Sequence, residues 1–218
     1  MDALDDELLA GRRRRAVFLP TAAAQEGEER LQYWVDLGVG HFTRLGAEVE
    51  PVLVLGRADA DDPGMAEKVA GAGLVYLSGG DPRFLAETLR GSAVAEAIHA
   101  AWSGGAALAG CSAGAMVLAA QVPSIRGPGD HVDGLGYAPG VVVVPHFDRI
   151  NEWLPGASDR IVSAAPAGMD VLGIDEDSAA VGDGRQWRVY GRGAVVLMHA
   201  GRDTRRLEAG ERFSTGPG

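Results

Sequence analysis

The apolar positions of the chain change their spacing several times, which predicts strands alternating with helices. Residues 16–20 (AVFLP) and 74–77 (LVYL) are short continuous apolar runs, typical of strands covered on both faces. Residues 26–45 instead place apolar side chains three or four positions apart, as an amphipathic helix does. Gly46 follows as the expected C-terminal cap of that helix.

The alternation continues to about residue 145 and then gives way to short strands. We expect strands at 49–55, 106–109 and 141–144 and helices over 83–89, 93–102 and 113–120. Beyond about residue 171, short apolar runs are joined by turn residues at 179–181, 186–190 and 194–198. This order predicts an α/β fold with a mostly parallel sheet and a C-terminal antiparallel extension. We predict a helical or mobile tail over 1–15 and a single domain over 16–218.

Charge and composition narrow the classes of function. The net charge of -10 argues against nucleic acid as a partner, and we interpret the basic run at 12–15 as a solvated lead-in to the first strand. The chain has no apolar run of about eighteen residues, so we expect no membrane span. Cys111 is the single cysteine, which excludes an intrachain disulfide, and the first ten residues are acidic, without the apolar core of a secretory signal. We therefore expect a cytoplasmic protein.

Residues 110–114 (GCSAG) have the pattern G-x-S-x-G between an apolar strand and an alanine-rich helix. In open α/β sheets this pattern makes a sharp turn, the nucleophile elbow, which presents the serine hydroxyl above the sheet. Ser112 is therefore our candidate nucleophile. Cys111 occupies the second place of the pattern, where we expect a small buried side chain.

A serine nucleophile needs a general base, and His146 has the best context among five histidines. It follows the valine strand at 141–144, and catalytic groups gather at the carboxyl edge of parallel strands. His131 is a minor alternative. A carboxylate must orient the imidazole, and the residues leave five candidates open. They are Asp175, Glu176 and Asp177 in one acidic turn, and Asp130 and Asp133 between the serine and the histidine.

The paired glycines that follow residues 74–77 suit close approach of the backbone to a ligand. We assign the oxyanion hole to the N–H groups of Gly80 and Ala113.

Five segments together resemble the serine peptidases that include aspartyl dipeptidase (dipeptidase E) and cyanophycinase. They are YLSGGDPRFL at 76–85, GCSAGAM at 110–116, VVPHF at 143–147, GIDEDSAAV at 173–181 and YGRGAVV at 190–196. The resemblance covers residues 16–200, in the order found in the family. It implies a three-layer flavodoxin-like fold, related to class I glutamine amidotransferases, with helices on both faces of the sheet.

Carried over to this chain, the resemblance implies Ser112 as nucleophile and His146 as base. It favours Glu176 as the triad acid, with Asp130 as second choice, and implies neither a metal nor an organic cofactor. The family acts on peptides with an aspartyl residue at the cut, so an arginine that binds a carboxylate is expected. Arg160 and Arg149 are the candidates, although the stretch after His146 (HFDRINEW) departs from the cyanophycinase pattern.

The sequence therefore predicts a serine peptidase that hydrolyses small acidic peptides or isopeptides through an acyl-enzyme. Two alternatives are an amidase or amidotransferase-like enzyme acting on a non-peptide amide, and a non-catalytic binding domain of the same fold. The expected partner is a small peptide substrate, with no nucleic acid or membrane, and a homodimer is left open.

Overall fold

The chain separates into two compact units, which we describe one at a time. The computed structural model describes residues 1–123, 130–199 and 204–216. The N-terminal unit comprises Asp2–Gly114, and the C-terminal unit comprises Ala115–Gly218 together with Met1.

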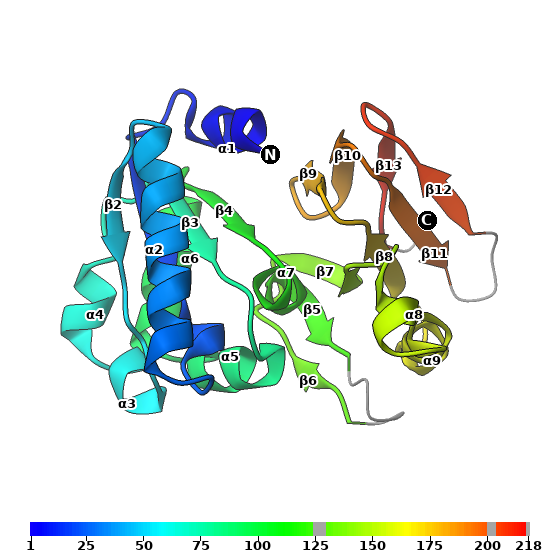
Figure 1. Cartoon of the computed structure of the whole chain (residues 1–218), viewed down its shortest axis with the longest axis horizontal. Helices are drawn as coiled ribbons and strands as arrows, with labels where there is room; N and C mark the ends of the chain where they lie inside the picture. Colours follow the sequence, from blue (N-terminus) through cyan, green and yellow to red (C-terminus); the bar gives the residue numbers. More distant parts are fainter. Residues whose placement is uncertain (124–129, 200–203, 217–218) are drawn as a thin grey trace. The chain divides into compact units, whose positions relative to one another are not determined.

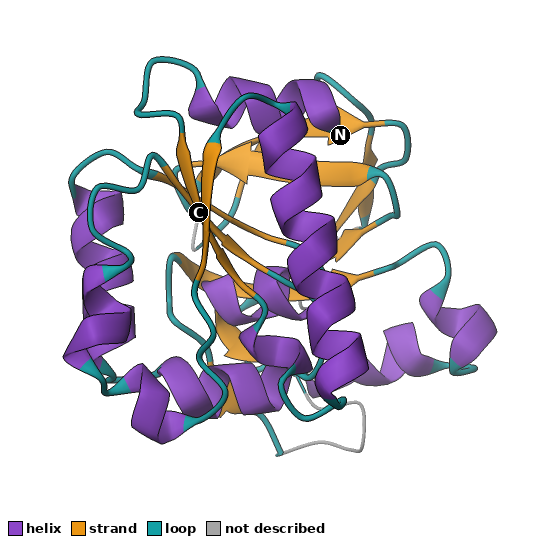
Figure 2. Cartoon of the chain, turned by 60° about the vertical axis from the view of Figure 1, so that its left-hand side comes forward, coloured by secondary structure: helices purple, strands orange, loops and turns teal. Residues whose placement is uncertain are grey.

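The N-terminal unit contains a four-stranded parallel sheet with strand order β2-β1-β3-β4. Its elements are α1 (Asp2–Leu9), β1 (Arg15–Leu19), the 3-10 helix η1 (Thr21–Ala23), α2 (Glu28–Arg44), β2 (Glu48–Pro51), α3 (Arg57–Ala60), α4 (Pro63–Glu67), β3 (Leu74–Leu77), α5 (Pro82–Leu89), α6 (Ala93–Ser103) and β4 (Ala107–Gly110). The long helix α2 lies across the strands of this sheet (Figures 1 and 2).

Close packing of α2 on the sheet depends on a glycine in the helix. All five residues of β1 are buried, so this strand is covered on both faces. A Cβ atom at Gly38 of α2 would lie 2.6 Å from the ring of Phe18 in β1. Glycine therefore lets the helix backbone approach the strand. At its C-terminal end, Gly46 has a φ of +74° and donates its N–H to the carbonyl oxygen of Thr43 at 2.9 Å, as the sequence predicted for a cap.

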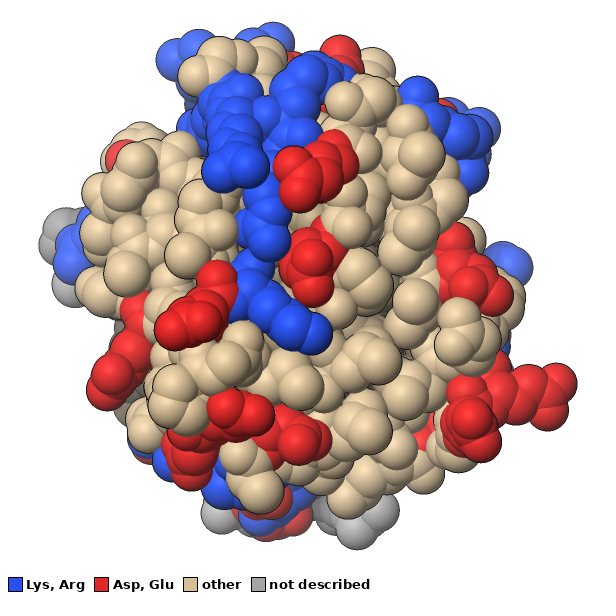
Figure 3. Space-filling model, turned by 90° about the vertical axis from the view of Figure 1, so that its left-hand side faces the viewer, with Lys and Arg blue, Asp and Glu red and all other residues tan. Residues whose placement is uncertain are grey.

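Three of the four arginines at 12–15 pair with acidic side chains. Arg13 and Arg15 each lie 3.7 Å from a carboxylate oxygen of Glu48, and Arg14 lies 2.7 Å from a carboxylate oxygen of Asp6. Figure 3 shows basic and acidic groups side by side on one face of the molecule. Arg13 and Arg14 are solvated, as expected. Arg15 is not: it is 8% exposed and donates hydrogen bonds to the carbonyl oxygens of Lys68 and Ala70, so the expectation of a solvated run is wrong at this residue.

The C-terminal unit contains a six-stranded mixed sheet with strand order β12-β11-β8-β7-β5-β6 and a three-stranded antiparallel sheet with order β13-β10-β9. Helix α7 (Ala113–Leu118) leads into it from the N-terminal unit. Its elements are β5 (Ala119–Val122), β6 (Val132–Asp133), β7 (Ala138–Pro145), α8 (Ile150–Trp153), α9 (Ala157–Ala164), β8 (Asp170–Ile174), β9 (Ser178–Gly182), β10 (Gln186–Gly191), β11 (Val195–His199), β12 (Arg205–Leu207) and β13 (Arg212–Ser214). Strands β5, β7 and β8 pair in parallel.

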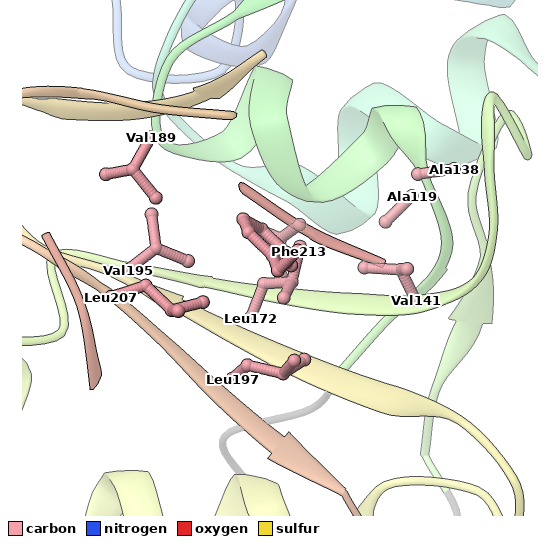
Figure 4. Close-up of a cluster of buried hydrophobic side chains, with 10 residues drawn as sticks. Ala119, Ala138, Val141, Leu172, Val189, Val195, Leu197, Leu207 and Phe213 are labelled. Carbon is pink, nitrogen blue, oxygen red and sulfur yellow. The ribbon is translucent and has the colours of Figure 1, made fainter. Parts of the chain in front are cut away.

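Apolar side chains from both sheets of this unit share one core (Figure 4). Leu172 of β8 and Leu197 of β11 come from the mixed sheet, whereas Val189 of β10 and Phe213 of β13 come from the antiparallel sheet. All four are at most 5% exposed. Burial of this apolar surface, worth about 25 cal/mol per Å², is what holds the two sheets together.

The predicted α/β class, with parallel strands, flanking helices and C-terminal antiparallel strands, is confirmed. Several predicted boundaries differ from the structure; the strand expected at 141–144, for example, is Ala138–Pro145. Two further boundaries are wrong. The helix expected over 113–120 ends at Leu118, because Ala119 already pairs with Ala138 of β7. The strand expected at 49–55 ends at Pro51, although Val52 and Val54 are fully buried. No helix among the described residues has the length and apolar character needed to cross a membrane.

Candidate active site

Ser112 stands at a strained turn between β4 and α7. Its φ of +50° falls in the left-handed region, which residues other than glycine rarely adopt. The turn is attached to the end of β3, because Cys111 donates its N–H to the carbonyl oxygen of Leu77 at 3.1 Å and Gly114 donates to that of Ser78 at 3.0 Å. A strained serine between strand and helix is the geometry of a nucleophile elbow.

Small residues around Ser112 allow this turn to form. A Cβ atom at Gly114 would lie 2.2 Å from the carbonyl oxygen of Leu77, closer than any van der Waals contact allows. A Cβ atom at Gly79 would lie 3.3 Å from the Cβ of Ser112 and 3.1 Å from the ring of Trp34. The last glycine of the motif is therefore required by a backbone contact with β3.

We expect Gly114→Ala to destabilise the N-terminal unit by about 1–3 kcal/mol, because the new methyl group must push the elbow away from β3. Urea unfolding measures the change. Gly56→Ala is the matched control, since a Cβ atom there meets nothing within 4 Å and the φ of -176° suits any residue. Equal stability of the two variants would show that the elbow tolerates a side chain at 114.

The two expected oxyanion donors lie on the segments that follow β3 and β4. Gly80 has a φ of +137°, and a Cβ atom there would lie 2.3 Å from the carbonyl oxygen of Ala22. Asp81 donates its N–H to that same oxygen at 2.8 Å, which holds the loop after β3 close to η1. Ala113 is the first residue of α7, and the N–H groups in the first turn of a helix have no acceptor within the helix.

The thiol of Cys111, next to the serine, is in an environment that opposes its ionisation. Burial raises the pKa of Cys111 above its ordinary value, outweighing the opposite effect of hydrogen bonds from Tyr76 and from the backbone of Gly79. Tyr76 is itself partly buried, and its desolvation raises its pKa as well. A thiol that stays protonated is a poor nucleophile, so this environment favours a structural role for Cys111.

In the C-terminal unit, His146 lies against Glu176. The imidazole Nδ1 is 3.2 Å from Glu176 Oε1, and the side chains are 34% and 44% exposed. The parallel register of β7 and β8 accounts for this contact, because Pro145 pairs with Ile174 at the carboxyl end of both strands. The residues that directly follow these strands are therefore brought to one edge.

The backbone around this pair is held by specific contacts. His146 has a φ of +64°, and the next residue, Phe147, donates its N–H to the carbonyl oxygen of Ile174 at 3.0 Å. Glu176 donates its own N–H to Asp148 Oδ1 at 2.9 Å. Gly173 has no room for a side chain, since a Cβ atom there would lie 2.5 Å from the Phe147 ring. These contacts position both members of the pair.

The two acids beside Glu176 face other partners. Asp175 is 5% exposed, and its Oδ2 accepts hydrogen bonds from Arg206 at 3.0 Å and from the N–H of Ala194 at 3.1 Å. Asp177 forms an ion pair with Arg192. Of the remaining candidates, Asp130 is exposed, and Asp133 lies in β6, which pairs with β5.

Both candidate arginines lie in the C-terminal unit and are exposed. Arg149 Nη1 is 3.3 Å from Glu152 Oε1, and its side chain is 50% exposed. Arg160 donates from Nη1 to the carbonyl oxygen of Pro155 at 2.9 Å. Both guanidinium groups therefore keep further N–H donors with which to meet a substrate carboxylate.

Two tryptophans, one near Gly79 and one beside His146, were not identified from the sequence. The ring of Trp34 in α2 would lie 3.1 Å from a Cβ atom at Gly79, and its Nε1 is buried without a hydrogen-bond partner among the described residues. Trp153 of α8 has its ring centroid 5.3 Å from that of His146. Neither stands in a recognisable motif, so only the packing reveals them. Nowhere in the described part of the chain do three His, Cys, Asp or Glu side chains gather as metal ligands would.

Comparisons with known proteins agree with the resemblance seen in the sequence. Residues 2–190 match the description of peptidase family S51. Cyanophycinases from Synechococcus elongatus and Thermosynechococcus vestitus are each 36% identical to the chain in an alignment 164 residues long. The alignment covers 69% of this chain and 49% of the relative. The chain thus spans about half the length of these curated relatives.

A solved structure of a peptidase from an acI-B1 Actinobacterium is similar over nearly the whole chain. It is 37% identical with a TM-score of 0.90, and the match covers 98% of this chain and 90% of that one. The family resemblance inferred from the five sequence segments is thereby confirmed. The chain belongs to peptidase family S51.

Proposed function

We propose that this chain is a serine peptidase that hydrolyses small acidic peptides or isopeptides. The observation that carries the proposal is the strained elbow at Ser112, with a φ of +50° and the neighbouring loop packed against it. Membership of the peptidase family and the contact between His146 and Glu176 support it. The family match extends over both groups of residues.

In the proposed reaction, Ser112 Oγ attacks the scissile carbonyl carbon while His146 Nε2 takes the hydroxyl proton. Glu176 accepts a hydrogen bond from His146 Nδ1–H, so the unprotonated nitrogen that acts as base is Nε2. The N–H groups of Gly80 and Ala113 stabilise the developing oxyanion. The imidazolium then gives its proton to the leaving amine, and an acyl-enzyme forms on Ser112. Water attacks this ester with His146 as base, which releases the acid and restores the serine.

Covalent labelling tests the assignment directly. A fluorophosphonate probe should react with the folded protein and leave its label on the peptide that contains Ser112, as mass spectrometry would show. Labelling of another residue, or no labelling of a folded protein that hydrolyses peptides, would refute the assignment. Activity on small amides but on no peptide would instead favour an amidase.

We further propose that a substrate carboxylate binds an arginine, with Arg160 the first candidate and Arg149 the second. A charged hydrogen bond contributes about 1.5–3 kcal/mol, so loss of the right arginine should lower kcat/KM about 10- to 100-fold. The measurement compares Arg160→Ala and Arg149→Ala on Asp-X, β-Asp-X and blocked peptides. Arg185→Ala is the control, because Arg185 is exposed on the turn between β9 and β10. Equal loss on peptides without the carboxylate would contradict this role.

A cytoplasmic location is also part of the proposal. The single cysteine suits a reducing compartment, in which disulfides are rare. Fractionation of the native host cells would test it, and recovery of the protein outside the cytoplasm would contradict it.

A further inference from the structure

The Trp153 side chain presents a large apolar surface to solvent beside His146. It is 57% exposed, and its ring lies at a centroid distance of 5.3 Å and an interplanar angle of 54° from the imidazole. Removal of such a surface from water is favourable. A ligand that covers the exposed ring beside the imidazole would therefore gain binding free energy.

The backbone holds Trp153 in this place. Arg149 and Ile150 both donate their N–H groups to the carbonyl oxygen of His146, at 2.9 and 2.7 Å. Helix α8 therefore begins directly on the histidine, and Trp153 follows at its last position. Ile150 is buried in a core cluster with residues of β7 and α9, which anchors this short helix. The indole and the imidazole are thus parts of one local structure.

The chemistry of acyl transfer indicates which part of a substrate would contact the Trp153 ring. The histidine that takes the serine proton gives it to the leaving nitrogen, so that nitrogen must come within hydrogen-bond distance of the imidazole. The side chain of the leaving residue is attached one carbon atom beyond the nitrogen. Groups that flank the imidazole are therefore within its reach.

We propose that Trp153 forms the apolar wall of the subsite for the leaving residue and gives the enzyme a preference for large apolar or aromatic side chains there. This inference rests on the proposed function, because it takes His146 as the group that protonates the leaving amine. Contact with the indole should favour a leaving phenylalanine over alanine about five- to tenfold, within the range of an aromatic pair. A leaving leucine should be favoured over alanine through the larger apolar surface that it buries.

Binding to an inactive protein tests the subsite without any need for turnover. Calorimetry on Ser112→Ala would compare the Kd values of Asp-Phe, Asp-Leu and Asp-Ala. We expect Asp-Phe to bind about five- to tenfold more tightly than Asp-Ala. The preference should vanish in Ser112→Ala/Trp153→Ala and persist in Ser112→Ala/Trp153→Phe. Equal affinities in Ser112→Ala, or a preference that survives Trp153→Ala, would overturn the inference.

A matched control exists in the same chain. Trp102 is 41% exposed, and its ring centroid lies 5.7 Å from that of His99, so Trp102→Ala removes a similar indole beside a different histidine. It should leave the preference unchanged.

The kinetics of Trp153→Ala, with Ser112 intact, distinguish two roles for Trp153: direct contact with the leaving residue, and positioning of His146. If Trp153 contacts the leaving residue, kcat/KM should fall for Asp-Phe and change little for Asp-Ala. An equal fall in kcat for all leaving residues would mean that Trp153 positions His146 and would overturn the inference. Trp153-dependent binding in a protein that hydrolyses none of the peptides would support the subsite while refuting the peptidase activity.

Discussion

Ser112→Ala is expected to abolish peptide hydrolysis, with a fall in kcat of at least about a thousandfold, while the protein remains folded. Removal of the hydroxyl takes away the only atom of the side chain that can form the acyl-enzyme. Alanine and serine experience similar strain at a φ of +50°, so the free energy of unfolding should change by less than about 1 kcal/mol. Steady-state kinetics and urea unfolding measure the two effects.

Cys111→Ala is the matched control for the nucleophile. The thiol is the neighbouring reactive group, and burial raises its pKa. We expect this variant to keep most of its activity and its labelling by the fluorophosphonate. If Cys111→Ala were inactive and Ser112→Ala active, the thiol would be the nucleophile and the proposed mechanism would be wrong.

Glu176→Gln is expected to lower kcat about 100- to 10,000-fold with little change in KM. Glu176 Oε1 lies 3.2 Å from His146 Nδ1, and a neutral amide there can neither stabilise the imidazolium nor enforce the required tautomer. The pair is partly exposed, so the cost to folding stability should be small. Steady-state kinetics on one peptide across the variants gives the comparison.

The comparison variants change the competing acids. Asp130→Asn should alter kcat less than about threefold if the assignment to Glu176 is right. Asp177→Asn should behave in the same way, because Asp177 pairs with Arg192. A large loss in Asp130→Asn, with an active Glu176→Gln, would transfer the role of the acid to Asp130.

Much of the fold follows from local patterns. The apolar run at 74–77 is strand β3, and the helical spacing over 26–45 is α2, with its glycine cap. These predictions succeed because burial on both faces and amphipathic spacing are properties of neighbouring residues. Local patterns do not predict the end of the alanine-rich helix after Ser112, because Ala119 and Ala120 also have a high helix propensity. Pairing with β7, which starts at Ala138, makes them strand β5 instead.

The sequence alone determined the elbow, because its chemistry is local: a tight turn requires small residues at fixed positions around one serine. Tertiary structure decided which partner each acid of the 175–177 turn contacts. Neighbouring side chains point in different directions, so Asp175 turns inward to Arg206, Asp177 meets Arg192, and Glu176 reaches His146. Which acid meets the imidazole depends on the register of β7 against β8, a contact between residues about thirty positions apart that no local pattern encodes.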